Sequence, residues 1–181
     1  SVANNNEAIA FDTFVDNATK AMHTTADLEA FKVYGTISQN GAVVTNIFDG
    51  VEVSNPTGVW AYEQQHTQYW IPGHTYYFAA LAPMNSANVE VDTTYANELG
   101  LGTIKFKNVD GTEDLLYSAV VEKAPAMGES KTVKFTFNHL LSKVKFSFTN
   151  GFTNPNTYID VKNVKITNAP AAATVVLNKV W

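Results

Sequence analysis

One stretch of the sequence constrains the fold more than any other, because its apolar residues alternate strictly with polar ones. Over residues 133–137, and again over 144–148, every second residue is Val or Phe and the residues between are Lys, Thr or Ser. Successive side chains of a β-strand point to opposite faces, so a period of two places all the apolar residues on one face. The stretch predicts two half-buried strands joined by a short corner over residues 138–143, and it contains no catalytic set of residues.

Short apolar runs of this kind continue along the rest of the chain. They predict strands over residues 8–15, 31–37, 43–48, 51–53, 76–82, 103–109, 115–121 and 158–167. The run 76–82 is apolar on both faces, which is typical of a central strand covered on both sides. A change of phase in the run 158–167 predicts a β-bulge near Lys162 and Asn163.

Turn signals separate these runs. Asn-Gly or Asp-Gly pairs at residues 40–41, 49–50 and 110–111 predict turns, and the last of them would join 103–109 to 115–121 in a hairpin. Residues 83–101 are predicted to form a long loop. No segment of helical period exceeds a turn or two, so the predicted fold class is an all-β sandwich.

Composition excludes several classes of function. The net charge is -5 and Arg is absent, which argues against a nucleic-acid partner. Cys is also absent, so disulfides, thiolate metal sites and Cys nucleophiles are excluded. The four histidines (His23, His66, His74 and His139) have no metal-ligand spacing, and no nucleophile elbow or phosphate-binding loop occurs. We therefore expect no enzymatic activity, no metal site and no cofactor.

Aromatic residues in the middle of the chain leave one alternative open. Trp60, Tyr62, Tyr69 and Trp70 flank a polar link. Together they would form a platform that stacks on sugar rings, as in a surface carbohydrate-binding module. The competing interpretation places two or three of these rings in the core. Tyr69 and Trp70 are adjacent and point to opposite faces, so at most part of the set faces solvent.

The two ends of the sequence predict how the chain is divided. No apolar run is long enough to span a membrane, and residues 1–7 are expected to be a polar tether. Residues 8–168 are expected to form the sandwich. Residues 169–181 are expected to be a linker followed by the first strand of a second domain, because the sequence is strand-like to its last residue.

Four segments also resemble a known family. They are residues 17–21, 76–83, 114–119 and 133–144, with the sequences NATKA, YYFAALAP, DLLYSA and VKFTFNHLLSKV. In this order they resemble the fimbrillin family of Bacteroidales, which comprises the Mfa-like and FimA-like type V pilus proteins. The resemblance extends from about Ile9 to Thr167.

The resemblance implies a fold, a location and partners. Fimbrillins have two transthyretin-like, Greek-key β-sandwich domains, of which this chain would be the N-terminal one. They are exported as lipoproteins, anchored in the outer membrane by an N-terminal lipid on the precursor, and reach the cell surface or the fimbrium. The implied partners are other pilin subunits, joined by strand exchange, and host or bacterial surface ligands if the protein is a pilus-associated adhesin.

The resemblance also implies where processing occurs. In polymerising fimbrillins a protease cuts after the basic residue that follows the first strand, and loss of that strand opens a groove for a strand of the next subunit. Carried over here, the Lys20–Ala21 bond is the candidate cleavage site. The candidate removable strand is 8–15, with Ile9 and Phe11 on one face and Ala10 and Asp12 on the other. The absence of Arg leaves two options open, a protease that accepts Lys or a subunit that stays capped as an anchor, tip or non-polymeric surface protein.

Overall fold

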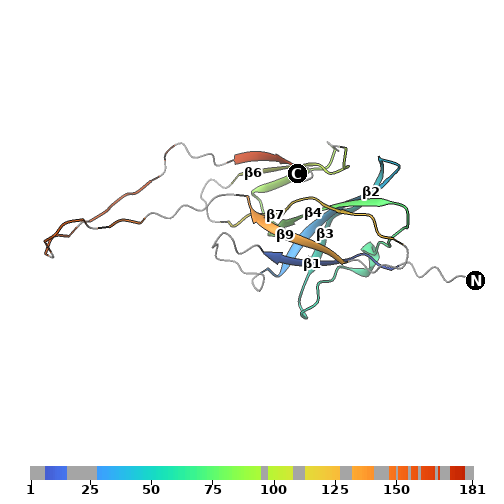
Figure 1. Ribbon diagram of the computed structural model, residues 1–181, viewed down its shortest axis with the longest axis horizontal. Helices are drawn as coiled ribbons and strands as arrows, with labels where there is room; N and C mark the ends of the chain where they lie inside the picture. Colours follow the sequence, from blue (N-terminus) through green and yellow to red (C-terminus); the bar gives the residue numbers. More distant parts are fainter. Residues whose placement is uncertain are drawn as a thin grey trace, which may run out of the picture.

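Figure 1 shows a computed structural model of the chain, with the strands in two sheets. The structure describes residues 7–15, 28–94, 98–107, 113–126, 132–140, 147–149, 151–154, 156–158, 160–165, 167 and 172–177. Its strands are β1 (Ala10–Val15), β2 (Ala30–Gln39), β3 (Ala42–Ser54), β4 (Thr75–Ala82), β5 (Val89–Asp92), β6 (Thr103–Lys107), β7 (Leu116–Ser118), β8 (Val121–Lys123), β9 (Thr132–His139) and β10 (Ala172–Val176). One turn of 3-10 helix, η2 (Gln64–His66), lies between β3 and β4.

The strands form a large sheet and a small sheet. The order in the large sheet is β1-β9-β7-β4-β2-β3, and β8 also pairs with β4. Its pairs are antiparallel except that β1 runs parallel to β9. The small sheet has the antiparallel order β10-β6-β5. This two-sheet, all-β arrangement confirms the predicted β-sandwich.

The strict alternation in the sequence is reproduced in burial along β9. Val133, Phe135 and Phe137 are buried, whereas Lys134 is exposed. The run that is apolar on both faces is β4, which lies between β2 on one side and β7 and β8 on the other. Phe78 on β4 packs into the larger core cluster and Leu81 into the smaller one. The central position predicted for this strand is therefore confirmed.

The larger core cluster is enclosed by the large sheet itself. The sheet curls so that Phe11 on its edge strand β1 meets Phe48 on the opposite edge strand β3, with ring centroids 5.2 Å apart. The segment 61–70 joins the same two edges, because Ala61 pairs with Ser54 at the end of β3 and Tyr69 pairs with Ala8 just before β1. The smaller cluster lies between the two sheets, where Tyr34, Ala79 and Leu81 meet Ile104 and Leu177.

The turn at residues 40–41 is confirmed, but the turn predicted at 49–50 is wrong. Asn40 and Gly41 have φ of 53° and 79°, as a two-residue hairpin turn requires, and they join β2 to β3. Gly50 also has a positive φ, of 68°, but it lies inside β3, which continues through it. The register between β2 and β3 shifts between Val33 and Tyr34, so this Asp-Gly pair marks an irregularity within a strand.

The hairpin predicted across residues 103–121 is also wrong. β6 belongs to the small sheet, between β10 and β5, whereas β7 belongs to the large sheet, between β4 and β9. The predicted loop 83–101 contains β5, a short strand paired with β6. Sequence-adjacent strands thus separate into different sheets, which local turn signals do not specify.

The C-terminal part of the chain departs furthest from expectation. The described residues between 147 and 167 form no strand, and Figure 1 shows them projecting away from both sheets. Phe148, Tyr158 and Val164 are exposed there, so the strand predicted over 158–167 is wrong, and most of that predicted over 144–148 lies outside the described residues. By contrast, β10 pairs with β6 and Leu177 is buried in the smaller cluster. The last described strand therefore pairs within this sandwich, and the division of the chain at residue 168 stays an expectation.

Candidate functional site

The candidate site is the position that β1 occupies at the edge of the large sheet, which we call the β1 seat. Six successive residues of β1 pair in parallel with β9, from Ala10 opposite Thr132 to Val15 opposite Phe137. In Figure 1, β1 (blue) lies beside β9 (orange), although the two strands are far apart in the sequence. A strand at the edge of a sheet forms a ladder on one side only, so it is the most separable type of strand in a sheet.

The side chains of this strand form part of the core rather than a cover over it. Ile9 is 1% exposed and Phe11 is 4% exposed, which confirms that they share a buried face. The Phe11 ring stacks on Phe135 of β9, with centroids 5.7 Å apart, and meets Phe78 edge-on at 5.8 Å. Thr13 is also buried, and its hydroxyl donates to the carbonyl oxygen of Phe135 at 3.2 Å.

The three residues at the start of the strand are held by a different part of the chain. The Ile9 amide donates to the carbonyl oxygen of Gln68 at 2.8 Å, and the Trp70 amide donates to the carbonyl oxygen of Glu7 at 3.0 Å. The Tyr62 hydroxyl donates to the carbonyl oxygen of Ile9 at 2.6 Å. The β1 seat therefore has two walls, β9 against residues 10–15 and the 62–70 segment against residues 7–9.

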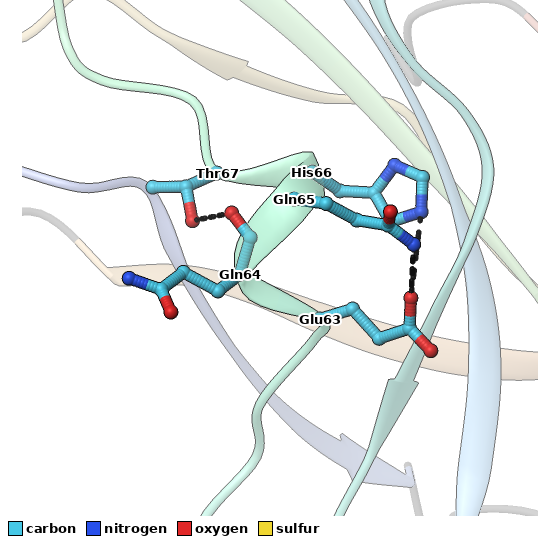
Figure 2. Close-up of polar contacts among 5 residues, drawn as sticks. All are labelled: Glu63, Gln64, Gln65, His66 and Thr67. Atoms are coloured by element: carbon cyan, nitrogen blue, oxygen red, sulfur yellow. Dashed lines mark hydrogen bonds and ion pairs between the residues drawn. The ribbon is translucent and has the colours of Figure 1, made fainter.

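One turn of 3-10 helix, η2, lies between the two ends of this second wall. Figure 2 shows η2, where the Thr67 hydroxyl donates to the carbonyl oxygen of Gln64 at 2.6 Å. The same figure shows the side chains of Gln65 and His66 both directed to the Glu63 carboxylate. The main chain closes the turn with bonds from His66 to Glu63 and from Thr67 to Gln64. These contacts order the link between Tyr62 and Gln68, although the side chains involved are solvated.

Buried aromatic residues attach the second wall to the central strand. The Tyr76 hydroxyl, on β4, accepts a hydrogen bond from the Ile71 amide at 2.7 Å and donates to the Tyr69 carbonyl oxygen at 3.5 Å. Trp70 is 5% exposed and packs edge-on against Tyr76, with ring centroids 4.8 Å apart. Burial raises the pKa of Tyr76, and burial likewise raises the pKa of Tyr62, partly offset by a main-chain hydrogen bond at Gln68.

The structure does not assemble the four rings of the predicted sugar platform into one exposed surface. Trp70 is buried, and Trp60 and Tyr62 are half-buried and pack against the larger core cluster. Tyr69 is 50% exposed. A stacking platform needs accessible ring faces, and Tyr69 is the one exposed ring of the set.

Two of the segments that carry the family resemblance, residues 114–119 and 133–144, make a contact that the sequence did not predict. His139 Nδ1 lies 2.6 Å from Asp114 Oδ1, at the point where β7 and β9 pair. The contact joins the DLLYSA segment to His139 at the end of β9, and the Leu140 amide adds a hydrogen bond to the carbonyl oxygen of Leu115 at 2.8 Å. His139 Nε2 is buried without a hydrogen-bond partner, so the contact with Asp114 is made through Nδ1 alone. The contact holds in place the strand that forms the first wall of the β1 seat.

The other candidate residues and groups add little at this site. Lys20 and Ala21, the candidate cleavage residues, lie outside the described residues. Among the residues that the structure describes, no group of three or more His, Asp or Glu side chains is placed to hold a metal ion. Within the same part of the chain, no helix is long and apolar enough to cross a membrane.

The fold and the site define an all-β sandwich protein with an edge strand seated between two walls. A model of the fimbrillin-like family matches residues 17–181, and the chain therefore belongs to this family. No curated protein and no solved structure matched the chain significantly. The family match begins after β1, so membership does not depend on that strand. Fimbrillins are structural pilus proteins, and membership supports a role as a fimbrial subunit at the cell surface.

Proposed function

We propose that this fimbrillin assembles with other pilin subunits by exchanging its first strand. A protease cuts the Lys20–Ala21 bond, β1 leaves its seat, and an extended segment of another subunit pairs with β9 in its place. The interaction is β-strand addition, in which main-chain hydrogen bonds supply affinity and alternate side chains supply specificity.

The observation that carries this proposal is the dual nature of β1. The strand lies at a sheet edge, yet it contributes Ile9 and Phe11 to the larger core cluster. Its departure would expose the edge of β9 together with the apolar face formed by Val133, Phe135 and Phe137. Such a surface has unpaired backbone groups and a large apolar area, so it needs a replacement strand of matching pattern.

We extend the proposal to the cellular setting that the family resemblance implies. The precursor would be exported as a lipoprotein and anchored in the outer membrane before assembly. The two-domain, transthyretin-like architecture would place a second sandwich beyond residue 181. A protease that accepts Lys would be required at residue 20, since the sequence has no Arg. Without such a protease the subunit would remain capped, with β1 in its seat, as an anchor, a tip or a non-polymeric surface protein.

Controlled proteolysis tests the proposal. The full-length protein is incubated with a Lys-specific protease, and the products are examined by mass spectrometry, denaturing gel and electron microscopy. A Lys20→Gln variant serves as the matched control. We expect cleavage after Lys20 in the parent, followed by ladders or filaments that the variant does not form. Cleavage that leaves soluble monomers with β1 in place would contradict polymerisation and favour the capped role.

A surface carbohydrate-binding module remains the alternative function, with less in its favour. Of the four aromatic residues first considered for it, Tyr69 is the one with a half-exposed ring. A glycan array probed with the parent protein and with Tyr69→Ala distinguishes the two functions. Binding by the parent that the variant loses would support the module, whereas no binding, or equal binding by both, would remove it.

A further inference from the structure

We infer that Tyr62 and the main chain from Gln68 to Trp70 form a latch, which retains the first strand and selects the strand that replaces it. The inference rests on the strand-exchange function proposed above, because retention has consequences for assembly only if the strand leaves. It assigns to Tyr62 a positioning role that the family resemblance does not specify.

Three hydrogen bonds converge on the start of the strand. The Tyr62 hydroxyl and the Gln68 carbonyl oxygen bind the two main-chain groups of Ile9, at 2.6 Å and 2.8 Å. The Trp70 amide binds the carbonyl oxygen of Glu7 at 3.0 Å. The ladder with β9 begins only at Ala10, so residues 7–9 are held by the latch and residues 10–15 by β9. The strand is thus secured at its start by a second element, which an ordinary edge strand lacks.

The latch is a built feature rather than a chance contact of a loop. Trp70 and Tyr76 tie it to the central strand, and η2 spaces Tyr62 from Gln68. The Tyr62 ring packs against Phe11, with centroids 5.7 Å apart, and against Phe48 at 5.5 Å. Tyr62 therefore touches the first strand through both its ring and its hydroxyl, and it bridges the two edges of the curled sheet.

The two walls together define which strand fits. The entering segment must run parallel to β9. It must also have at least three residues on the N-terminal side of the part that pairs with β9, to occupy the place of residues 7–9. It needs a branched aliphatic residue at the position of Ile9 and an aromatic residue at that of Phe11, because both sites are closed and apolar. A Thr at the third inward position matches the carbonyl oxygen of Phe135, which a purely apolar side chain would leave without this bond. Proline is excluded at the position of Ile9, because that amide donates to Gln68.

Hydrogen exchange in the intact chain tests the latch without any cleavage. The parent is compared with Tyr62→Phe, which keeps the ring and removes the hydroxyl, and with Tyr69→Phe as a matched control in the same segment. We expect the Ile9 amide to exchange about fivefold faster in Tyr62→Phe, the effect of one lost hydrogen bond, with β4 amides unchanged. Equal Ile9 rates in the parent and Tyr62→Phe would overturn the inference, as would an equal acceleration in Tyr69→Phe.

A second measurement remains decisive if Tyr62→Phe does not fold. A specific protease site inserted in the segment 16–27 allows the parent chain to be cut, and a fluorescent peptide of residues 7–15 then competes for the seat. A peptide with an N-methyl group on Ile9 should compete about fivefold more weakly, because it lacks the bond to Gln68. Equal competition by the two peptides would overturn the latch.

These outcomes separate the latch from the proposed assembly. Filaments that form after cleavage, with neither Tyr62→Phe nor the N-methyl group having an effect, would refute the latch and leave the strand exchange intact. Latch effects in a protein that never forms filaments would refute polymerisation alone.

Discussion

The two edge strands of the large sheet, β1 and β3, both have unpaired backbone groups on one side, and they differ in how they are protected. β3 has 13 residues, three register shifts against β2 and two exposed acidic side chains, Asp49 and Glu52. β1 has six residues, pairs with β9 in unbroken register and places Phe11 in the core. Bulges and charges are devices that prevent further strands from adding to an edge. β3 carries these devices, whereas β1 has an unbroken ladder with β9 and covers the edge that β9 would otherwise expose.

The difference also appears in how each edge strand is connected. β3 follows β2 through the two-residue turn at Asn40 and Gly41, so it cannot leave without unfolding the hairpin. β1 reaches β2 through the longer segment 16–29, and its pairing partner β9 lies more than 100 residues away. A single cut in that segment would turn β1 into a bound peptide. A single cut before or after β3 would leave β3 covalently attached to the chain at its other end.

The largest expected effect comes from matched Phe-to-Ala changes on the two edges. Phe11→Ala and Phe48→Ala should each lower the free energy of unfolding by about 3–5 kcal/mol, because both rings are buried and leave a cavity. Urea denaturation of the uncut chain measures both. The two rings touch, so the double variant should cost less than the sum of the single ones.

The same pair of variants distinguishes a replaceable strand from a fixed one. In a chain cut within residues 16–27, an excess of the parent peptide 7–15 should restore the stability of Phe11→Ala, because the defect lies on the strand being exchanged. The peptide should not restore Phe48→Ala. If the peptide restores both variants, or neither, the contrast between the edges is wrong.

The next effect concerns β9, which would become an edge strand if β1 left as proposed. His139→Leu removes the contact with Asp114 and should lower the free energy of unfolding by about 1–2 kcal/mol, since the His139 side chain is mostly buried. His66→Leu is the control, because His66 and Glu63 are exposed and 4.0 Å apart, and it should change stability by less than about 0.5 kcal/mol. Thermal or urea unfolding of both variants provides the measurement, and equal losses would mean that the His139 contact has no special role.

The elements predicted correctly from the sequence are those whose signal is local. A period of two identifies β9 and the buried face of β1, and apolar residues on both faces identify β4, because each pattern reports the surroundings of a single strand. The same reasoning fails at residues 49–50, where an Asp-Gly pair that favours a turn lies inside β3. Pairing with β2 continues past it, and the register shift absorbs the irregularity.

The sequence predicted only part of the β1 seat, because only part of it depends on a local pattern. Ile9 and Phe11 follow from alternation, but the Tyr62 hydroxyl lies 53 residues from the carbonyl group that it binds. The pairing of β6 with β10 instead of β7 is likewise decided by packing between distant segments. No spacing rule within one segment encodes such contacts. The fimbrillin resemblance predicted the family because it compares the residue sequences of several whole segments.

A glycine on the guarded edge gives a smaller effect. Gly50→Ala should lower the free energy of unfolding by about 1–2 kcal/mol, because φ is 68° there and an added methyl would lie 3.3 Å from the Tyr34 hydroxyl oxygen. Gly41→Ala is the control, since its φ is 79° but nothing lies within 4 Å of the added methyl. Urea midpoints should rank Gly50→Ala below Gly41→Ala. The reverse order would show that the irregularity in β3 tolerates a side chain.

The smallest effect concerns pH and compares Tyr62, at the β1 seat, with Tyr34, beside β3. Burial raises the pKa of both hydroxyls above the ordinary value of 10, with Asp49 adding to the effect at Tyr34. Each hydroxyl therefore keeps its proton to higher pH in the folded chain than in the unfolded one. The stability that depends on this is fully present below pH 10 and is lost as the pH rises through the folded pKa.

Tyr62→Phe and Tyr34→Phe should both make the decline in unfolding free energy above pH 10 less steep, as measured by urea titrations between pH 8 and pH 11.5. At pH 8, Tyr62→Phe should be less stable than the parent by about 1 kcal/mol, because it lacks the bond to the Ile9 carbonyl oxygen. In a chain cut within residues 16–27, raising the pH above 10 should release β1 from the parent by ionising Tyr62, whose oxygen then no longer donates. Tyr34→Phe should release β1 over the same pH range, because Tyr34 does not belong to the seat, whereas Tyr62→Phe should lose this dependence. Identical release profiles for the two variants would show that the hydroxyl of Tyr62 does not hold the strand.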